Sequence, residues 1–371
     1  MNREHLCLRI CTAAGCRSRG GERLRHGCSD AMQPWPLQVK GVGCLGPCSD
    51  GPLLALDGID SSRLFGLRTW MVAGHANDDR SAAVKALTAS LCQAMPQGLA
   101  GWHPPGAVAI AADDPFLTLQ RRLVLGRCGR IDPDSIDDAL VAGAYRQLAG
   151  VLARNDPSTV IAALQASSLR GRGGAGYPTG QKWAAVAAMA GPRKVVVCNG
   201  DEGDPGAFMD RTVLEGDPHA VLEGMVIAAH AVGAERGYVY VRAEYPLAIA
   251  RLRRAIGQAE QRGWLGAAIG GSSLRFQLEL RVGGGAYVCG EETALIRSIE
   301  GRRGVPRPRP PYPAQEGVFG LPTLINNVET FACIAPVLQL GAEAYGPGTK
   351  VFSLTGHVRR SGVLEVPMGT S

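Results

Sequence analysis

Strand and helix patterns alternate through the middle of the chain, and this rhythm constrains the fold more than any other feature. Two short apolar segments, 194–198 and 237–242, and one alternating segment, 274–281, predict strands. Each is followed by a helical pattern, at 217–233, 245–263 and 291–299. Asp217, an N-cap before Pro218, and Gly233 mark the ends of the first helix. The alternation predicts an α/β fold with a parallel sheet covered by helices.

The composition indicates a chain that buries a sizeable core. Hydrophobic residues make up 46% of the 371 residues and charged residues 19%, which excludes disorder of the whole chain. The net charge of +6 is modest and dispersed, so no nucleic-acid partner is expected. The sequence contains no run of about 18 apolar residues, which is the length that would predict a transmembrane helix. The first twenty residues lack the apolar stretch of a secretory signal.

A glycine-rich segment at 168–183 is the first candidate site. Five glycines fall within 171–180, and the backbone N–H groups of such a loop can point into one anion-binding concavity. A helix expected from Thr179 would add its positive end, with Lys182 in its first turn. No Gly-Lys-Ser/Thr sequence follows, so the segment is not a P-loop. The alternative interpretation is a flexible glycine loop that binds nothing.

Two acidic segments follow predicted strands. Asn199, Asp201 and Glu202 come directly after the valine-rich strand, at the carboxyl end where ligands of parallel sheets bind. Their amide and carboxylate groups suit a polar ring edge or ribityl hydroxyls. Glu291 and Glu292 follow a glycine turn at the start of a predicted helix. The alternatives are a polar loop with Asx turns for the first segment and plain helix capping for the second.

Two later segments carry weaker signals. A proline-rich stretch contains Arg309, which suits a phosphate, and Tyr312, which suits stacking on a ring. The alternative for this stretch is a rigid linker or a polyproline ligand. Asn326 and Asn327 are unusually polar for residues that immediately precede an apolar helix.

The cysteines point to an iron–sulfur centre near the N-terminus. Six of the eleven cysteines fall within the first 48 residues, including the pairs Cys11 and Cys16, and Cys44 and Cys48. Structural zinc sites prefer C-x₂-C pairs, whereas iron–sulfur clusters take four thiolates with variable spacing. The spacing therefore favours iron–sulfur over zinc, with Cys7 or Cys28 as possible replacements among the ligands.

The order of these motifs resembles one family. The chain reads Arg170-Gly-Arg-Gly-Gly-Ala-Gly-Tyr-Pro-Thr-Gly, Cys198-Asn-Gly-Asp-Glu-Gly-Asp-Pro-Gly-Ala, Gly285-Ala-Tyr-Val-Cys-Gly-Glu-Glu-Thr, Pro310-Pro-Tyr-Pro-Ala and Ile325-Asn-Asn-Val-Glu-Thr. This series resembles the NADH-oxidising flavoprotein subunit of respiratory complex I. It also resembles the diaphorase subunits of NAD-reducing hydrogenases and NAD-dependent formate dehydrogenases. The N-terminal cysteine pairs look like the thioredoxin-like [2Fe–2S] domain fused to such diaphorases.

The resemblance implies FMN with NAD(H) stacked above it, and a [2Fe–2S] cluster on Cys11, Cys16, Cys44 and Cys48. It implies that Glu202 and Glu292 are catalytic through their charge, because hydride passes directly from the nicotinamide to flavin. The cofactor-binding residues that it implies are Gly171, Arg172, Gly173, Gly174, Ala175, Gly176, Tyr177, Gly180, Lys182, Asn199, Asp201, Glu202, Gly203, Tyr287, Gly290, Glu291, Glu292, Arg309, Tyr312, Asn326, Asn327 and Thr330. The implied partners are NADH and the iron–sulfur electron-transfer subunits of a larger complex.

The chain departs from the family pattern at several points. Tyr177 and Tyr312 stand where the family usually has Phe, and Arg309 stands where Lys is common. The family continues into a helical bundle with a C-x₂-C-x₂-C site, so a [4Fe–4S] cluster is expected only in a full-length chain. We therefore expect the sequence to stop inside a further domain, after two β segments near 353–358 and 362–366.

The expected organisation is a thioredoxin-like [2Fe–2S] domain at 1–91, a linker at 92–116, a Rossmann-like FMN/NAD(H) domain at 117–340 and the start of a β-grasp-like domain at 341–371. The leading hypothesis is an NADH:acceptor oxidoreductase of the diaphorase type. The alternatives are an NAD⁺-reducing subunit of a hydrogenase or formate dehydrogenase, and a truncated, non-catalytic cofactor-binding or assembly protein. The expected location is cytoplasmic, or peripheral on the cytoplasmic face of a membrane complex.

Overall fold

The computed structural model describes residues 6–58, 62–68, 77–191 and 193–371, without the side chains of 77–79. The chain forms two compact units. The first contains Met1–Gln120, Arg127–Pro133 and Phe352–Leu364, and the second contains Arg121–Gly126, Asp134–Val351 and Glu365–Ser371. No helix in the described part of the chain is long and apolar enough to cross a membrane.

The first unit is built on a five-stranded mixed sheet in the order β2-β1-β3-β4-β5. Its strands are β1 (Leu6–Cys11), β2 (Leu37–Val42), β3 (Leu53–Asp57), β4 (Ser62–Gly66) and β5 (Val108–Ile110). β1 and β2 are parallel, and the other neighbours are antiparallel. Its helices are α1 (Ala14–Ser18), α2 (Gly21–Met32), α3 (Asn77–Ala94) and α4 (Pro115–Thr118).

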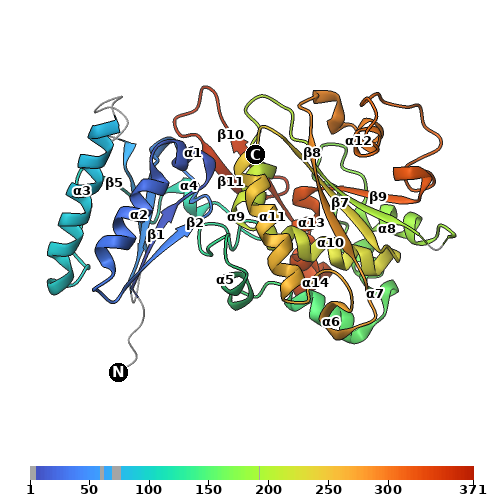
Figure 1. The fold of residues 1–371 in the computed structure, drawn as a ribbon, viewed down its shortest axis with the longest axis horizontal. Coiled ribbons are helices and arrows are strands. Elements are labelled where there is room, and N and C mark those ends of the chain that lie inside the picture. Colours follow the sequence, from blue (N-terminus) through green and yellow to red (C-terminus); the bar gives the residue numbers. More distant parts are fainter. Residues whose placement is uncertain (1–5, 59–61, 69–76, 192) are drawn as a thin grey trace. The chain divides into compact units, whose positions relative to one another are not determined.

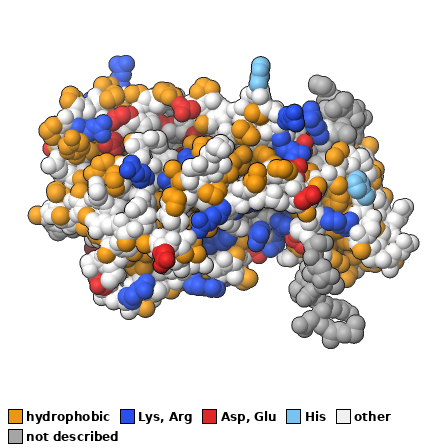
Figure 2. All heavy atoms as spheres, turned by 180° about the vertical axis from the view of Figure 1, so that it is seen from behind, with side chains coloured by type: hydrophobic (Ala, Val, Ile, Leu, Met, Phe, Trp, Pro, Cys, Tyr) orange, Lys and Arg blue, Asp and Glu red, His pale blue; other side chains and the backbone are white. Residues whose placement is uncertain are grey.

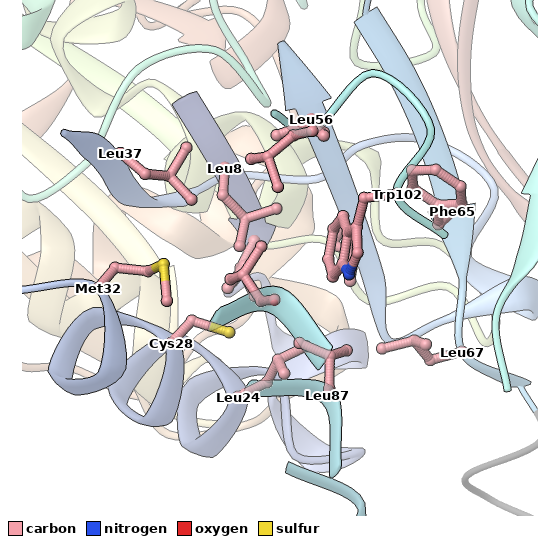
Figure 3. Packing of buried hydrophobic residues seen from close by; sticks show 14 of the residues in the cluster. Leu8, Leu24, Cys28, Met32, Leu37, Leu56, Phe65, Leu67, Leu87 and Trp102 are labelled. Atoms are coloured by element: carbon pink, nitrogen blue, oxygen red, sulfur yellow. The ribbon is translucent and has the colours of Figure 1, made fainter. Parts of the chain in front are cut away.

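Two apolar clusters fill the first unit. In the larger one, Leu24 of α2 and Leu87 of α3 pack with Leu8 of β1 and with Trp102 (Figure 3). The second cluster gathers Cys11, Cys16 and Cys44 with apolar neighbours, and Cys48 packs against it. Because successive side chains of a strand point to opposite faces, Ile10 of β1 faces the first cluster whereas Cys11 faces the second.

The prediction of a linker at 92–116 does not agree with the structure. Val108–Ile110 within this range forms β5 and pairs with β4, and the first half of the range contains the end of α3. The three residues of β5 are too few to show a strand period. The sequence therefore indicated only the glycines and prolines that surround this strand.

The second unit contains the predicted parallel sheet, which confirms the α/β fold class. Its strands are β6 (Val195–Gly200), β7 (Arg236–Arg242), β8 (Gln277–Gly283) and β9 (Thr323–Asn327), in the order β8-β7-β6-β9 (Figure 1). All three neighbouring pairs are parallel. From β6 the chain runs outward through β7 to β8 and then returns to the other side of β6 as β9. The strand order therefore reverses between β6 and β9.

Helices cover the sheet of the second unit. They are α5 (Ile136–Val141), α6 (Arg146–Arg154), α7 (Pro157–Ala166), α8 (Thr179–Ala187), α9 (Met209–Gly216), α10 (Pro218–Val232), α11 (Pro246–Gln261), α12 (Glu292–Ile299), α13 (Val328–Ala332) and α14 (Ile334–Tyr345). α12 packs on one face of the sheet through Leu295 and Ile296, against Val195, Val197 and Ile325. α10 is buried along its whole length.

The ends of α10 follow the signals in the sequence. The side chain of Asp217 accepts a hydrogen bond from the N–H of Ala220 at 3.1 Å, and Gly233 adopts a left-handed conformation at the C-terminus. Near the end of the chain, β10 (Thr349–Leu354) and β11 (Gly362–Pro367) form a two-stranded sheet. The segment predicted near 362–366 is thus present as β11, whereas the segment predicted near 353–358 overlaps β10 only at Ser353 and Leu354. Their assignment to a further domain stays a prediction.

The surface agrees with the modest net charge. Figure 2 shows Lys and Arg side chains at several separate places on the face that it displays, with acidic and uncharged side chains between them. Basic residues do not form one continuous patch on that face.

Candidate functional site

A cavity of about 660 Å³ lies in the second unit, beside the carboxyl ends of β6 and β9. Asn199 of β6 and Asn327 of β9 are directly paired in the sheet, and both line the cavity. The strand order reverses at this point, and such a switch point is where open parallel sheets bind their ligands.

Many of the residues predicted from the sequence line this cavity. They are Arg172, Gly173, Gly174, Asn199, Asp201, Glu202, Gly203, Tyr287, Gly290, Glu291 and Asn327. They come from four separate segments that the fold brings together. This convergence is the main structural finding about the site.

The glycine loop is closed at its base and open at its tip. The N–H of Gly171 donates to the carbonyl of Tyr177 at 2.9 Å, which closes the loop. A Cβ atom added at Gly173 would lie 3.0 Å from the Cβ of Asn327, whereas one added at Gly174 would meet nothing within 4 Å. Glycine at 173 thus lets the loop approach β9. Gly174, with a φ of +113°, requires glycine for its backbone conformation.

Thr330 and Asn326 act in the framework of the site. The hydroxyl of Thr330 accepts a hydrogen bond from the N–H of Arg172 at 2.9 Å and thereby ties the glycine loop to α13. The side chain of Asn326 accepts from the indole N–H of Trp183 at 3.2 Å. A Cβ at Gly180 would lie 2.6 Å from the backbone N of Gln165, so this glycine lets α8 pack closely on α7.

The acidic residues after β6 are held by local hydrogen bonds. Glu202 is 8% exposed, and its carboxylate accepts from the N–H groups of Asp210 and Arg211 at 3.1 and 3.2 Å. The hydroxyl of Tyr245 donates to the same carboxylate at 3.1 Å. The side chain of Asn199 accepts a hydrogen bond from the N–H of Asp201 at 3.0 Å. This bond forms an Asx turn, as the alternative interpretation of this segment expected. These bonds fix Glu202 and Asn199 at the cavity wall.

Asp201 has a perturbed acidity. Burial raises its pKa to about 6, and Glu244 adds to the increase, while Arg242 opposes it. Nε of Arg242 lies 3.8 Å from Oδ1 of Asp201, whereas Nη2 of the same guanidinium lies 2.7 Å from Oε1 of Glu244. The cationic partner of Asp201 is therefore weak, and burial is the larger influence on its acidity.

Glu291 and Glu292 have different surroundings. The carboxylate of Glu291 accepts from the N–H groups of Thr293 and Ala294 at 2.9 and 3.0 Å and so caps α12, as the capping alternative expects. Glu292 pairs with Arg309 at 2.7 Å and lies 3.5 Å from the ammonium of Lys182. Lys182 also donates to the carbonyl of Ile325 at 3.1 Å. Glu292 thus contacts both Arg309 and Lys182, and none of these three predicted residues lines the cavity.

The remaining predicted residues lie away from the lining. Tyr177 is 51% exposed, with the ammonium of Lys182 5.9 Å from the centre of its ring, and Tyr312 is 55% exposed. The predicted residues that do not line the cavity are Gly171, Ala175, Gly176, Tyr177, Gly180, Lys182, Glu292, Arg309, Tyr312, Asn326 and Thr330. Direct roles for them in cofactor binding stay predictions.

Several residues that line the cavity were not predicted from the sequence. They are Asp204, Ala207, Met209, Asp210, Val288, Pro306 and Lys350. Asp204 accepts from the hydroxyl of Tyr287 at 2.6 Å, which joins two walls of the cavity. Asp204 and Asp210 lie within the acidic motif after β6 and could have been selected there. Lys350 carries no local signal, because only the fold brings it to the cavity.

The four predicted cluster cysteines come together in the first unit. Cys11 ends β1, Cys16 lies in α1, and Cys48 begins a short 3₁₀ helix, Cys48–Asp50. The sulfurs of Cys44 and Cys48 are 3.5 Å apart. Hydrogen bonds with Cys16 and Cys44, together with burial, raise the pKa of Cys11 well above its ordinary value. Cys28 lies in the other apolar cluster, with Leu8 and Leu24.

These thiols are close enough to share a ligand. Among the residues that the structure describes, no three His, Cys, Asp or Glu side chains are arranged to hold a single metal ion. The hydrogen bonds nevertheless link Cys11 with Cys16 and Cys44, and Cys44 with Cys48. A binuclear cluster needs two thiolates at each of two irons rather than one compact tetrahedral set. The donor set therefore fits a [2Fe–2S] cluster.

Comparison with known proteins places these observations in a family context. Residues 164–336 match the family described as the Nuo51 FMN-binding domain. The chain is 53% identical over 259 residues to the NADP-reducing hydrogenase subunit HndC of Solidesulfovibrio fructosivorans, covering 68% of this chain and 52% of the relative. It is 46% identical over 236 residues to a subunit of an NADH-quinone oxidoreductase of Rhizobium meliloti, covering 62% of this chain and 56% of the relative.

A solved structure is similar over nearly the whole chain. It belongs to an NAD⁺-reducing [NiFe]-hydrogenase in the H₂-reduced state, with a TM-score of 0.57 and 28% sequence identity. The match covers 99% of this chain and 59% of that one. The chain thus spans about half the length of the curated relatives it matches.

Proposed function

Because this chain belongs to the family of flavoproteins that carry the Nuo51 FMN-binding domain, we propose that its second unit binds FMN in the cavity beside β6 and β9 and oxidises NADH there. The observation that carries the proposal is the convergence of four separate motifs on that cavity, at the point where the strand order reverses. The cavity volume of about 660 Å³ falls in the range of cofactor and ligand pockets.

The residues of the cavity suit the parts of a flavin nucleotide. The open glycine loop at Gly173 and Gly174 offers backbone N–H groups to a phosphate. Asn199 and Asn327 offer side-chain amides to ribityl hydroxyls or to a polar ring edge. When bound, FMN would supply the hydride acceptor and the change from two-electron to one-electron transfer.

The acidic side chains would act through position and charge. Glu202 is fixed by two backbone N–H groups and by Tyr245, so its carboxylate stays at the wall of the cavity. Negative charge at this wall disfavours added negative charge on a bound ring and thereby lowers the reduction potential of that ring. Glu292, held between Arg309 and Lys182, would contribute at the nicotinamide side. None of these residues needs to donate or accept a proton during hydride transfer.

The first unit would carry the electrons onward. Cys11, Cys16, Cys44 and Cys48 would hold a [2Fe–2S] cluster, and when bound it would supply a one-electron carrier. The partners would be the iron–sulfur subunits of a larger complex, with a [4Fe–4S] cluster only in a longer chain. We place such a complex in the cytoplasm, or on the cytoplasmic face of a membrane complex.

The reverse direction, reduction of NAD⁺, is the second candidate function. It is favoured by the hydrogenase structure, whose similarity covers 99% of this chain, including the cysteine-bearing unit. The two directions use the same cavity, so the site does not separate them. They differ in the electron donor, which is NADH in one case and a reduced iron–sulfur partner in the other.

The test is NADH-dependent reduction of ferricyanide by the chain reconstituted with FMN, iron and sulfide. We expect turnover that is lost in the double variant Asn199→Ala and Asn327→Ala, while iron and acid-labile sulfide still bind the cysteines. FMN retained without turnover would favour the non-catalytic cofactor-binding alternative. Zinc in place of iron and sulfide would show that the first unit is a zinc-binding module.

A further inference from the structure

Asp210 is an acidic residue of the cavity with no assigned role. It is the second residue of α9, is 3% exposed and lines the cavity. Its Oδ2 atom accepts a hydrogen bond from the side-chain amide of Asn327 at 2.5 Å. Its Oδ1 atom is buried and has no hydrogen-bond partner among the residues that the structure describes. An ionised carboxylate with one neutral donor is costly in such a place.

Two other buried carboxyl groups face Asp210, and both have better partners. Glu202 accepts from two backbone N–H groups and from Tyr245. Glu329 on α13 is fully buried, and accepts from the ammonium of Lys350 and, at 2.8 Å, from the N–H of Val351. Both partners of Glu329 come from β10, so the charged groups around Asp210 come from the loop after β6, from α13 and from β10.

The distribution of partners decides which carboxyl keeps a proton. Glu202 and Glu329 add negative charge near Asp210, while Asn327 and Lys350 oppose their effect. Burial is the largest influence, and the pKa of Asp210 lies well above its ordinary value. The buried thiol of Cys198 on β6 also faces Asp210 and is uncharged, because burial raises its pKa as well. Of the three acids, Asp210 is the one whose ionisation is least supported by its neighbours.

We propose that Asp210 holds a proton at the wall of this cavity, and that binding of a phosphate-bearing cofactor requires Asp210 in its protonated form. The inference rests on the proposed function only in taking FMN as the ligand. An ionised Asp210 would add a third negative charge, beside Glu202 and Glu329, to a cavity that also receives the phosphate of FMN. Of the basic residues that line this cavity, Lys350 is already paired to Glu329, and Arg172 is the other. The protonated form removes that charge and leaves the hydrogen bond from Asn327 in place.

The proton balance of the step is simple. Below the pKa of Asp210 the carboxyl is already protonated, and FMN binds without proton exchange at this group. Above that pKa, the apo-protein takes up one proton from solvent as FMN binds. The dissociation constant for FMN therefore rises tenfold for each pH unit above the pKa of Asp210. Low pH favours binding and high pH opposes it.

The experiment is a titration of the whole apo-chain with FMN, followed by flavin fluorescence over about pH 5 to 10. This range begins just above ordinary carboxyl pKa values and spans strongly raised ones. We expect the affinity of the wild type to fall above the pKa of Asp210. In Asp210→Asn, which is neutral and nearly isosteric, this fall should disappear and the affinity at high pH should exceed that of the wild type. Calorimetry in two buffers of different ionisation enthalpy should show uptake of one proton by the wild type alone.

A matched control is available in Asp217→Asn. Asp217 is 1% exposed and caps α10, a position where Asn caps equally well, and it does not line the cavity. This variant should keep the pH profile of the wild type. As a readout independent of FMN, the infrared band of protonated carboxylic acid should be weaker in apo-Asp210→Asn than in the apo-wild type, and unchanged in Asp217→Asn.

Two results would overturn the inference. One is an unchanged pH profile in Asp210→Asn, and the other is an infrared spectrum that does not change with this substitution. If either occurs while FMN binds tightly, only the role of Asp210 is wrong. If FMN fails to bind the wild type and the variant at every pH, the proposed function fails together with this inference.

Discussion

Replacement of Asp201 by Asn should stabilise the apo-protein at neutral pH, although Asp201 lines the proposed cofactor cavity. Burial raises its pKa to about 6, and Glu244 adds to that effect against the opposing charge of Arg242. Compared with the ordinary value of 3.8, a pKa of about 6 corresponds to roughly 3 kcal/mol, at about 1.4 kcal/mol per pH unit. Because Asp201 is only partly buried, solvent screening reduces the expected effect to about 1–2 kcal/mol.

The sign of the pH dependence follows from the raised pKa. Below about pH 4, Asp201 is protonated in both the folded and the unfolded chain, so it has no effect on stability. Between about pH 4 and 6 the unfolded chain ionises first, and folding must retain a proton on this group. The destabilising effect is complete above about pH 6. Asp201→Asn removes it and should also weaken FMN binding.

The assay is urea unfolding of wild type and Asp201→Asn at pH 4 and at pH 7. We expect equal free energies of unfolding at pH 4, and a gain of about 1–2 kcal/mol for the variant at pH 7. Asp113→Asn is the control, because Asp113 is exposed and should change stability by less than about 0.5 kcal/mol. A variant that is less stable than the wild type at pH 7, or equally shifted at both pH values, would refute the reasoning.

Three other substitutions test separate parts of the account. Arg19 donates to the carbonyl of Cys48, a proposed cluster ligand, at 2.6 Å, so Arg19→Gln should make the midpoint potential of the reconstituted cluster about 50 mV more negative in a redox titration. Gly173→Val should weaken FMN binding at least tenfold in fluorescence titrations, because a Cβ atom at position 173 would lie 3.0 Å from the Cβ of Asn327. Gly150→Ala is the control and should not weaken binding, because a Cβ atom at position 150 would meet nothing within 4 Å. Lys350→Met should destabilise the chain by about 3–5 kcal/mol in urea unfolding, since its fully buried carboxylate partner would lose its cation. An unchanged potential in Arg19→Gln, unchanged FMN binding in Gly173→Val, or unchanged stability in Lys350→Met would contradict the corresponding expectation.

Local signals predicted the individual elements well. Asp217 and Gly233 mark both ends of α10 in the sequence, because a capping side chain and a left-handed glycine depend on only a few neighbouring residues. The strands β6 and β7 were likewise visible as short apolar runs. β5 was not, because its three residues gain their strand conformation from pairing with β4 rather than from their own pattern.

The cavity could be predicted only in part, for a physical reason. Residue patterns in the sequence, together with the resemblance to a known family, selected the glycine loop and the asparagines. Their meeting depends on β9 returning to the side of β6, which is a long-range pairing. Lys350 is partly buried and Asp210 is buried by the fold, and their hydrogen-bond partners, Glu329 and Asn327, are distant from them in the sequence. These contacts cannot be read from the sequence alone. The ion pair between Lys350 and Glu329 joins residues from two different elements.

The central claim is that the cavity beside β6 and β9 binds FMN and receives electrons from NADH. The most direct measurement is the visible spectrum of the reconstituted chain, under anaerobic conditions, before and after NADH is added. The account predicts flavin absorption that remains with the protein through gel filtration and is bleached by NADH. Loss of flavin on gel filtration, or retained flavin that NADH does not bleach, would contradict it.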